Sequence, residues 1–173
     1  MREPDAMHAD KPRLEGITLR QASLADLDLV CDLAQELNLI HHQAWPDVFA
    51  PPATPSRDRL HWQDSMLGAD RAIFLVEDAF GQSLGFIALS LIEERHSLLQ
   101  PMRYGRVNSV CVCPEARGMG LGRAMMAQAD DWAREHRATD MRLVVWAFNE
   151  QARKLYQELG YEVLSHTMGK RLA

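Results

Sequence analysis

Arg117-Gly118-Met119-Gly120-Leu121-Gly122-Arg123 is the most informative segment of the chain. An apolar run stopped by Pro114 comes before it, and a pattern typical of an amphipathic helix comes after it. Glycine at every second position lets the backbone turn sharply and bring its N–H groups close to a ligand. A helix that begins at such a turn adds unpaired N–H donors and a partial positive charge. The stretch therefore predicts a strand, an anion-binding turn and a helix, in that order.

The spacing of these glycines excludes two common phosphate-binding loops. A P-loop needs Gly-Lys-Ser/Thr at its end, and no lysine stands there. A dinucleotide fingerprint needs G-x-G-x-x-G in the first βαβ unit, whereas these glycines are two apart and come late in the chain. The pattern that remains is R-x-x-G-x-G, with Arg117 and Arg123 adding positive charge.

The rest of the chain reads as one α/β domain with a mixed sheet. Alternating apolar residues, helix caps and prolines predict the elements before the turn. They are a strand at 17–21, a helix capped by Ser23 and Asp26, a proline-rich loop at 45–55, a helix at 56–67, strands at 72–77 and 84–94, a polar connection at 95–103 and a strand at 106–113. After the turn we expect a helix at 122–136, a strand at 141–146, a helix at 150–159 and a terminal strand at 161–171.

Two motifs resemble those of the GCN5-related N-acetyltransferase (GNAT) family. One is the turn itself, together with the run Val110-Cys-Val-Cys-Pro-Glu115 that precedes it. The other is Asn149-Glu-Gln-Ala-Arg-Lys-Leu-Tyr-Gln-Glu-Leu-Gly-Tyr161, which is similar to N-x-x-A-x-x-L-Y-x-x-L-G-[FY]. Alone, the second motif could be a core-facing helix capped by Asn149. The resemblance covers 17–173 and implies a mostly antiparallel sheet, splayed at the cofactor site and flanked by about four helices.

The resemblance implies transfer of an acetyl group from acetyl-CoA directly to an amine. Tyr156 would then protonate the leaving thiolate, and Asn149 would orient the cofactor or a water. Backbone groups of Val110 and Val112 would pair with the pantetheine arm, and the Val110 N–H would also hold the developing oxyanion. The residues implied to bind the cofactor are Val110, Cys111, Val112, Arg117, Gly118, Met119, Gly120, Leu121, Gly122, Arg123, Asn149 and Tyr156.

The amine must lose a proton before it attacks, and the sequence leaves the base open. An alkylammonium with a pKa of about 10.4 costs roughly 4.6 kcal/mol to deprotonate at pH 7, against roughly 2 kcal/mol for protonating a thiolate. Many relatives carry a glutamate at the position aligned with Asn108, and an asparagine can only orient a water or the substrate. Glu93, Glu94 and His96 are the candidate substitutes, although a solvated surface role fits each of them as well.

Other titratable residues predict no further chemistry. Cys31, Cys111 and Cys113 read as reduced thiols in or near the core, because no histidine or carboxylate is placed to activate a catalytic cysteine. The adjacent His41 and His42 would point apart on a helix and have no carboxylate cluster beside them. We therefore predict no metal site.

Composition limits the partners. Residues 1–100 carry 8 Lys and Arg against 16 Asp and Glu, a charge of −8, whereas 101–173 carry 11 against 8, a charge of +3. The acidic half argues against nucleic acid, and the basic half suits an anionic cofactor. No apolar run reaches the roughly 18 residues of a membrane span. Residues 1–16 lack the apolar segment of a signal peptide and are expected to form a disordered leader of a cytoplasmic protein.

The sequence says least about the amine that accepts the acetyl group. Its binding site is expected in the first two helices, in the loop with Trp45 and Phe49, and at 95–105. We expect a small primary amine, with a protein N-terminus or lysine as the alternative. Because residue 108 is not glutamate, a non-catalytic acyl-CoA sensor also remains open, as does a homodimer.

Overall fold

A five-stranded sheet is the centre of the computed structural model, which describes residues 14–172. The strands lie in the order β1-β2-β3-β4-β5; the first four are antiparallel to their neighbours, and β5 is parallel to β4. The predicted mixed, mostly antiparallel sheet is thus confirmed. The strands are β1 Thr18–Gln21, β2 Arg71–Glu77, β3 Ser83–Glu94, β4 Met102–Val112 and β5 Asp140–Leu143.

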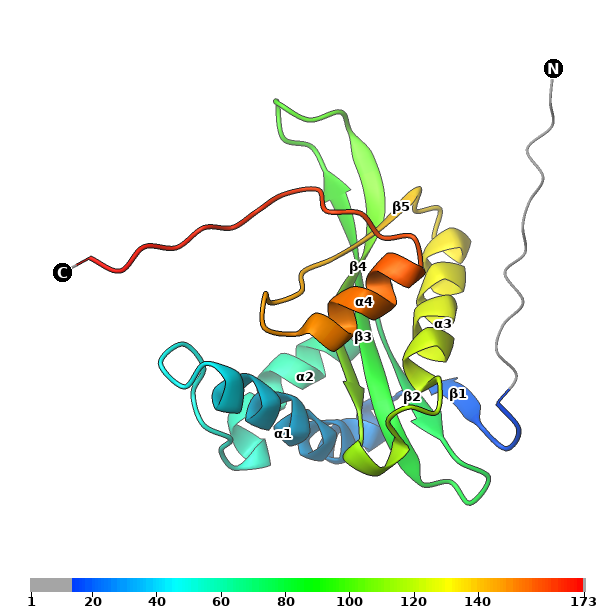
Figure 1. Ribbon diagram of the computed structural model, residues 1–173. Helices are drawn as coiled ribbons and strands as arrows, with labels where there is room; N and C mark the ends of the chain where they lie inside the picture. Colours follow the sequence, from blue (N-terminus) through cyan, green and yellow to red (C-terminus); the bar gives the residue numbers. More distant parts are fainter. Residues whose placement is uncertain (1–13, 173) are drawn as a thin grey trace.

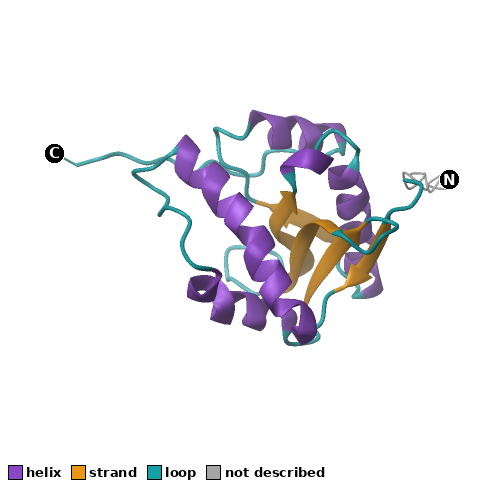
Figure 2. Ribbon diagram, turned by 90° about the horizontal axis from the view of Figure 1, so that it is seen from below, coloured by secondary structure: helices purple, strands orange, loops and turns teal. Residues whose placement is uncertain are grey.

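Helices cover both faces of this sheet (Figures 1 and 2). Helices α1 (Leu27–Ala44) and α2 (Arg59–Met66) pack on one face, and α3 (Leu121–Glu135) packs on the other. Helix α4 (Glu150–Glu158) lies on the α3 side, where Tyr156 contacts the core. Short 3₁₀ helices occupy Leu24–Asp26, Pro55–Asp58 and Pro114–Ala116. Among the described residues, no helix is both long and apolar enough to cross a membrane.

Alternation along the central strands produces two hydrophobic cores. On β3, Ile87 and Leu89 face α3, whereas Phe86 and Ala88 face α1 and α2. Successive side chains of a strand point to opposite faces, so a strand covered on both faces must be apolar throughout. Each central strand therefore presents one set of side chains to each helical layer.

The N-terminal boundary of the packed domain lies earlier than predicted. Leu14 packs against the α3-side core, and its carbonyl accepts a hydrogen bond from the Ile17 N–H at 3.1 Å. Leu14, within the segment 1–16 that the sequence suggests as a leader, therefore contacts the packed domain. Residues 1–13 lie outside the described residues.

The predicted terminal strand at 161–171 is wrong, and the strand at 141–146 is shorter than expected. Strand β5 ends at Leu143, and the chain from 161 to 172 contains no strand. A strand needs a neighbour to satisfy its backbone, and a four-residue edge strand offers little length for pairing. Val144 and Val163 are accordingly 85% and 68% exposed, despite their apolar side chains. Figure 1 shows the C-terminal segment extending away from the helices.

Gly85 marks a close approach of β3 to β4 and provides a test of this packing. A Cβ at this position would lie 2.2 Å from the Cys111 carbonyl oxygen and 3.1 Å from the Val112 Cα. Both are backbone atoms, which cannot relieve the clash by changing a side-chain rotamer. We expect Gly85→Ala to lower the free energy of unfolding by about 1–3 kcal/mol in urea titrations. The control is Gly169→Ala, where a Cβ meets nothing within 4 Å. Equal stability of the two variants would contradict the assigned register.

Candidate active site

Strand β4 has an open edge over its second half. Residues Tyr104–Val107 pair with β5, and beyond Val107 the described residues pair with β4 only on its β3 side. A β-bulge marks the point of separation, because Leu89 pairs with Val107 whereas Ala88 pairs with Ser109. Asn108 is therefore the extra residue, and such bulges bend a strand and re-aim its side chains. The predicted splay of the sheet is present here.

The open edge presents the backbone of Val110 and Val112. The Cys113 N–H donates to the Leu84 carbonyl at 2.8 Å, so Cys113 faces β3. Backbone groups alternate sides along an antiparallel strand, so Cys111 also faces β3, and Val110 and Val112 face outward. The outward groups lie where an extended ligand could add to the sheet as another strand.

The glycine-rich turn follows this edge directly and has the geometry of an anion site. Gly118 and Gly120 have φ of +79° and +83°, a backbone conformation that L side chains rarely adopt. Gly120 is the N-cap of α3 and supplies no side chain to the first turn. The first N–H groups of α3, from Leu121 onward, consequently lack an intrahelical acceptor. The turn thus combines free donors with the positive end of a helix dipole.

Gly122 has a packing role that the sequence did not predict. A Cβ at this position would lie 3.1 Å from Leu155 Cδ2, so the absent side chain lets α4 approach the first turn of α3. Arg123, in the same turn, is ion-paired with Glu158 at the end of α4. These contacts hold the Tyr156 helix beside the start of α3.

Both arginines of the turn are engaged within the protein. Arg117 forms an ion pair with Glu36 of α1 at 2.6 Å and donates through Nε to the Val112 carbonyl at 3.3 Å. Arg123 pairs with Glu158. Because each guanidinium faces a carboxylate, the backbone donors are the main uncompensated positive charge of the turn.

The second motif forms a capped helix whose tyrosine is partly buried. The Asn149 side chain accepts a hydrogen bond from the Ala152 N–H at 3.1 Å, as an N-cap does. Burial raises the pKa of the Tyr156 phenol, because desolvation disfavours the phenolate. The Tyr156 hydroxyl therefore stays protonated at neutral pH. Its ring lies 5.9 Å from that of Tyr161, whose buried hydroxyl has no hydrogen-bond partner among the described residues.

Asn108 is held by a neighbouring serine on β3. Its side-chain nitrogen donates to Ser90 Oγ at 3.1 Å, and Ser90 Oγ lies 3.3 Å from Asn108 Oδ1. The pair sits at the bulge, on an exposed part of the sheet beside the open edge. Either group retains capacity to hold a water.

The three candidate bases lie away from Asn108. Glu93 follows Leu91 by two residues and faces the α3 side, opposite to Ser90, and it pairs with Arg95 and Arg103. The Arg95 hydrogen bond holds the pKa of Glu93 below its usual value, which makes this carboxylate a weaker base. Glu94 is four residues beyond Ser90, roughly 13 Å along the strand, and accepts from the His96 N–H at 2.9 Å. Figure 1 shows this hairpin tip projecting beyond the helices.

The cysteines are not placed as nucleophiles. Cys31 and Cys111 are buried in the α1-side core, and Cys111 Sγ lies 3.5 Å from the Leu33 carbonyl oxygen. Burial raises the pKa of the Cys111 thiol to about 12 and raises that of Cys31, so both remain protonated at neutral pH. These residues are packing elements of the core.

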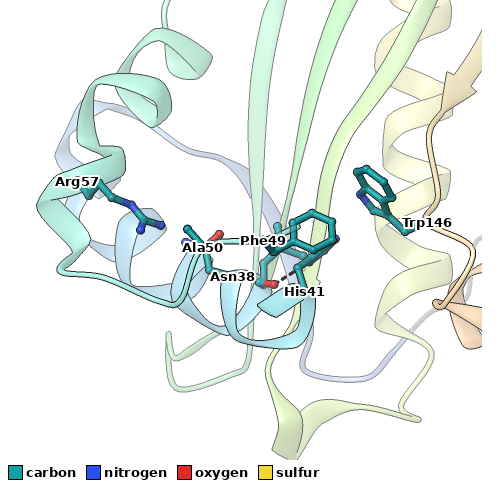
Figure 3. A pocket seen from close by; sticks show the side chains of 7 residues that line it. Asn38, His41, Phe49, Ala50, Arg57 and Trp146 are labelled. Atoms are coloured by element: carbon teal, nitrogen blue, oxygen red, sulfur yellow. Dashed lines mark hydrogen bonds between the residues drawn. The ribbon is translucent and has the colours of Figure 1, made fainter. Parts of the chain in front are cut away.

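A group of five rings, here called the aromatic cluster, adjoins α1. Each ring makes edge-on contacts to others in the group, with centroids 4.9–6.2 Å apart. Figure 3 shows Phe49 and His41 opposite Trp146. The sequence predicted a role for the aromatic residues of the loop but not for the rings after β5, and it placed Trp146 at the end of a strand. The cluster consists of His41, Trp45, Phe49, Trp146 and Phe148.

His41 and His42 hold the aromatic cluster and its loop in place through contacts with backbone carbonyl oxygens. His41 Nδ1 lies 2.8 Å from the Leu37 carbonyl oxygen, and His42 Nδ1 lies 2.8 Å from that of Phe49. Within residues 14–172, no group of three histidine, cysteine or acidic side chains could hold a metal ion. His41 and His42 fix the loop to the end of α1.

Comparison with known sequences identifies the family. The sequence model of the acetyltransferase (GNAT) family matches residues 34–161, which include the open edge, the glycine turn and α4. The chain belongs to the acetyltransferase (GNAT) family. This GNAT acetyltransferase therefore has the fold and motifs that its sequence predicted.

Two relatives illustrate the range of the match. An aminoglycoside N(6′)-acetyltransferase type 1 of Stenotrophomonas maltophilia is 26% identical over 145 residues, covering 84% of this chain and 86% of that protein. An uncharacterized N-acetyltransferase of Archaeoglobus fulgidus is 28% identical over 103 residues, covering 60% and 69%. Both are acetyltransferases by name, in agreement with the family.

Solved structures share the fold. A mutant of the BH1408 protein of Bacillus halodurans has a TM-score of 0.81 at 22% identity, covering 90% of this chain and 99% of that one. The acetyltransferase AAC(6′)-Iy, in complex with a CoA bisubstrate analog, has a TM-score of 0.67 at 19% identity, covering 91% and 98%. The GNAT acetyltransferase fold is thus reproduced over nearly the whole chain.

The anion site of the turn can be tested by charge at Gly120, with coenzyme A as the probe. Like charges about 4 Å apart repel by roughly 4 kcal/mol at an effective dielectric constant of 20. We expect Gly120→Asp to bind coenzyme A about 100-fold more weakly than Gly120→Asn, as measured by calorimetry and by the ligand-induced rise in Tm. Both residues tolerate a positive φ, so the pair shares its backbone strain. Equal binding by the two variants would refute the phosphate assignment.

Proposed function

We propose that this acetyltransferase moves an acetyl group from acetyl-CoA to a primary amine of a small molecule. The observation that carries the proposal is the open edge of β4, which runs into a turn with two glycines at positive φ and the start of α3. The edge supplies backbone groups for an extended arm, and the turn supplies donors for a pyrophosphate. The family and the named relatives support N-acetylation of small molecules.

Tyr156 is the proposed acid for the leaving thiolate. It lies on α4, which Leu155 holds against the first turn of α3. Its raised pKa keeps the proton on the phenol at neutral pH, ready for the sulfur when the thioester bond breaks. Cofactor contacts by Asn149, beyond its capping role, are part of the same proposal.

A water held by Asn108 and Ser90 is the proposed acceptor of the amine proton. Both side chains lie at the bulge beside the open edge, where the thioester carbonyl would meet the outward N–H of Val110. Glu93 faces the other side of the sheet, and Glu94 and His96 lie toward the hairpin tip. The position of Asn108 therefore favours a relayed proton transfer to solvent.

The decisive experiment is a steady-state assay of thiol release from acetyl-CoA with a panel of amines. Release that depends on the amine and yields the N-acetyl product supports the proposal. Binding of acetyl-CoA without any amine-dependent turnover indicates an acyl-CoA sensor instead, and turnover of peptides alone indicates a protein acetyltransferase. Slow thiol release without an amine does not count, because thioester hydrolysis needs no acceptor.

A homodimer is also part of the proposal. Strand β5 is an edge strand, and Val144, directly after it, is 85% exposed. Leu164 and Met168, in the segment after α4, are 73% and 92% exposed. Unpaired edges and exposed apolar side chains are typical of surfaces that associate. Sedimentation of the intact chain measures the mass of the species in solution.

Replacing Tyr156 tests the acid. Protonating a thiolate accounts for roughly 2 kcal/mol at pH 7, so we expect Tyr156→Phe to lower kcat by at most about 30-fold. The Kd for acetyl-CoA should barely change, because the ring remains. The control is Tyr161→Phe, which removes a buried hydroxyl without a partner among the described residues and should not lower kcat or stability. An unchanged kcat for Tyr156→Phe, with acetyl transfer as the slow step, would leave Tyr156 a packing residue only.

Replacing Asn108 tests the proton acceptor. Because amine deprotonation is the larger demand, Asn108→Ala should lower kcat/KM more than Tyr156→Phe does. The deficit should shrink as pH rises toward about 10.4, where the amine loses its proton unaided. Glu93→Gln is the matched control and should leave the rate unchanged. A larger loss in Glu93→Gln, Glu94→Gln or His96→Gln would place the base at the hairpin instead.

A further inference from the structure

A cavity of about 230 Å³ opens beside the aromatic cluster (Figure 3). Phe49, His41 and Trp146 form its aromatic wall, and Asn38 and Arg57 lie toward its polar end. The remaining lining is Leu37 and Ala50. An apolar cavity of roughly 150 Å³ accommodates benzene, so this volume suits one aromatic ring with a short chain.

The cavity is lined by α1, which touches β4, and by the connection that follows β5. Helix α1 touches β4 where Cys111 Sγ meets the Leu33 carbonyl. Leu37 follows one helical turn later and His41 a turn after that, so the cavity begins roughly 6 Å along α1 from this contact. On the other side, Trp146 stands three residues after Leu143, the last residue of β5. The cavity thus sits between the two segments that flank the splay.

The charges at the polar end are already paired. Arg57 Nε donates to Asp58 Oδ1 at 3.2 Å, and Asn38 donates to Asp58 Oδ2 at 3.1 Å. The Arg57 guanidinium holds the pKa of Asp58 below its usual value, so the carboxylate is ionised and neutralises the arginine. No acidic side chain belongs to the described lining itself. A polycation would find no unpaired carboxylate there to replace its hydration.

We propose that the acceptor is an arylalkylamine, with its ring in this cavity against Phe49 and Trp146. The proposal rests on the N-acetyltransferase function proposed above and specifies its substrate class. A flat ring gains edge-on and face-on contacts with the aromatic wall, and the alkylammonium remains favourable beside ring faces until it loses its proton. A hydroxylated polyamine such as an aminoglycoside has no aromatic ring to pack against this wall.

The experiment compares three acceptors: phenethylamine, butylamine and neamine. We expect the kcat/KM for phenethylamine to exceed that for each of the other two by at least about tenfold. Trp146→Ala and Phe49→Ala should each raise the KM for phenethylamine about tenfold and leave the KM for acetyl-CoA unchanged. The control is Phe80→Ala at the β2–β3 turn, where the ring is 97% exposed and its removal should change neither constant.

Calorimetry of phenethylamine on the coenzyme A-saturated protein separates the two proposals. Binding that Trp146→Ala abolishes, without turnover of any amine, upholds the arylalkylamine site and refutes the acetyl-transfer function. A higher kcat/KM for neamine or butylamine refutes the arylalkylamine site and leaves the function standing. The arylalkylamine proposal is also overturned if phenethylamine is neither bound nor acetylated, or if Trp146→Ala and Phe49→Ala both leave its KM unchanged.

Discussion

The separation of β5 from β4 after Val107 is the constraint on which the site depends. Backbone N–H and C=O groups need partners, and a strand with one free edge within a covered sheet keeps those groups available for a ligand. The bulge at Asn108 occurs at the same point and turns the strand into the opening. β3 holds the other edge of β4, and the two cores hold both of its faces, so contacts within the protein fix the position of the free edge.

At the end of that edge, the glycine turn likewise presents backbone groups that lack an intrahelical partner. Its donors belong to the backbone, and their direction is fixed by two positive φ angles. The neighbouring arginines, by contrast, are paired with Glu36 and Glu158. In the proposed cofactor site, a pyrophosphate would meet these N–H donors first, and the arginines would contribute only as far as they leave their carboxylates. The two ion pairs also tie α1 and α4 to the turn, so the cavity beside α1 and Tyr156 on α4 are both anchored to it.

The proposed acceptor site depends on contact between segments that are far apart in the sequence. The loop after α1 contributes Phe49, and the connection after β5 contributes Trp146, nearly a hundred residues later. The apolar, charge-paired cavity between them differs in character from what an aminoglycoside would require, although an aminoglycoside acetyltransferase is among the relatives. Relatives with one fold and one cofactor site can therefore differ in acceptor, since the acceptor contacts lie on loops rather than on the sheet.

Local sequence patterns were enough to predict the turn at 117–123, the order of the strands and helices around it, and the capped helix of Asn149 and Tyr156. These features are local: glycine spacing, cap residues and periodicity act within a few residues of the chain. It could not determine that Gly122 makes room for Leu155, that Glu93 faces away from Asn108, or that the segment at 161–171 forms no strand. Nor could it bring Trp146 to Phe49. Those outcomes depend on which surfaces meet, and only tertiary packing decides them.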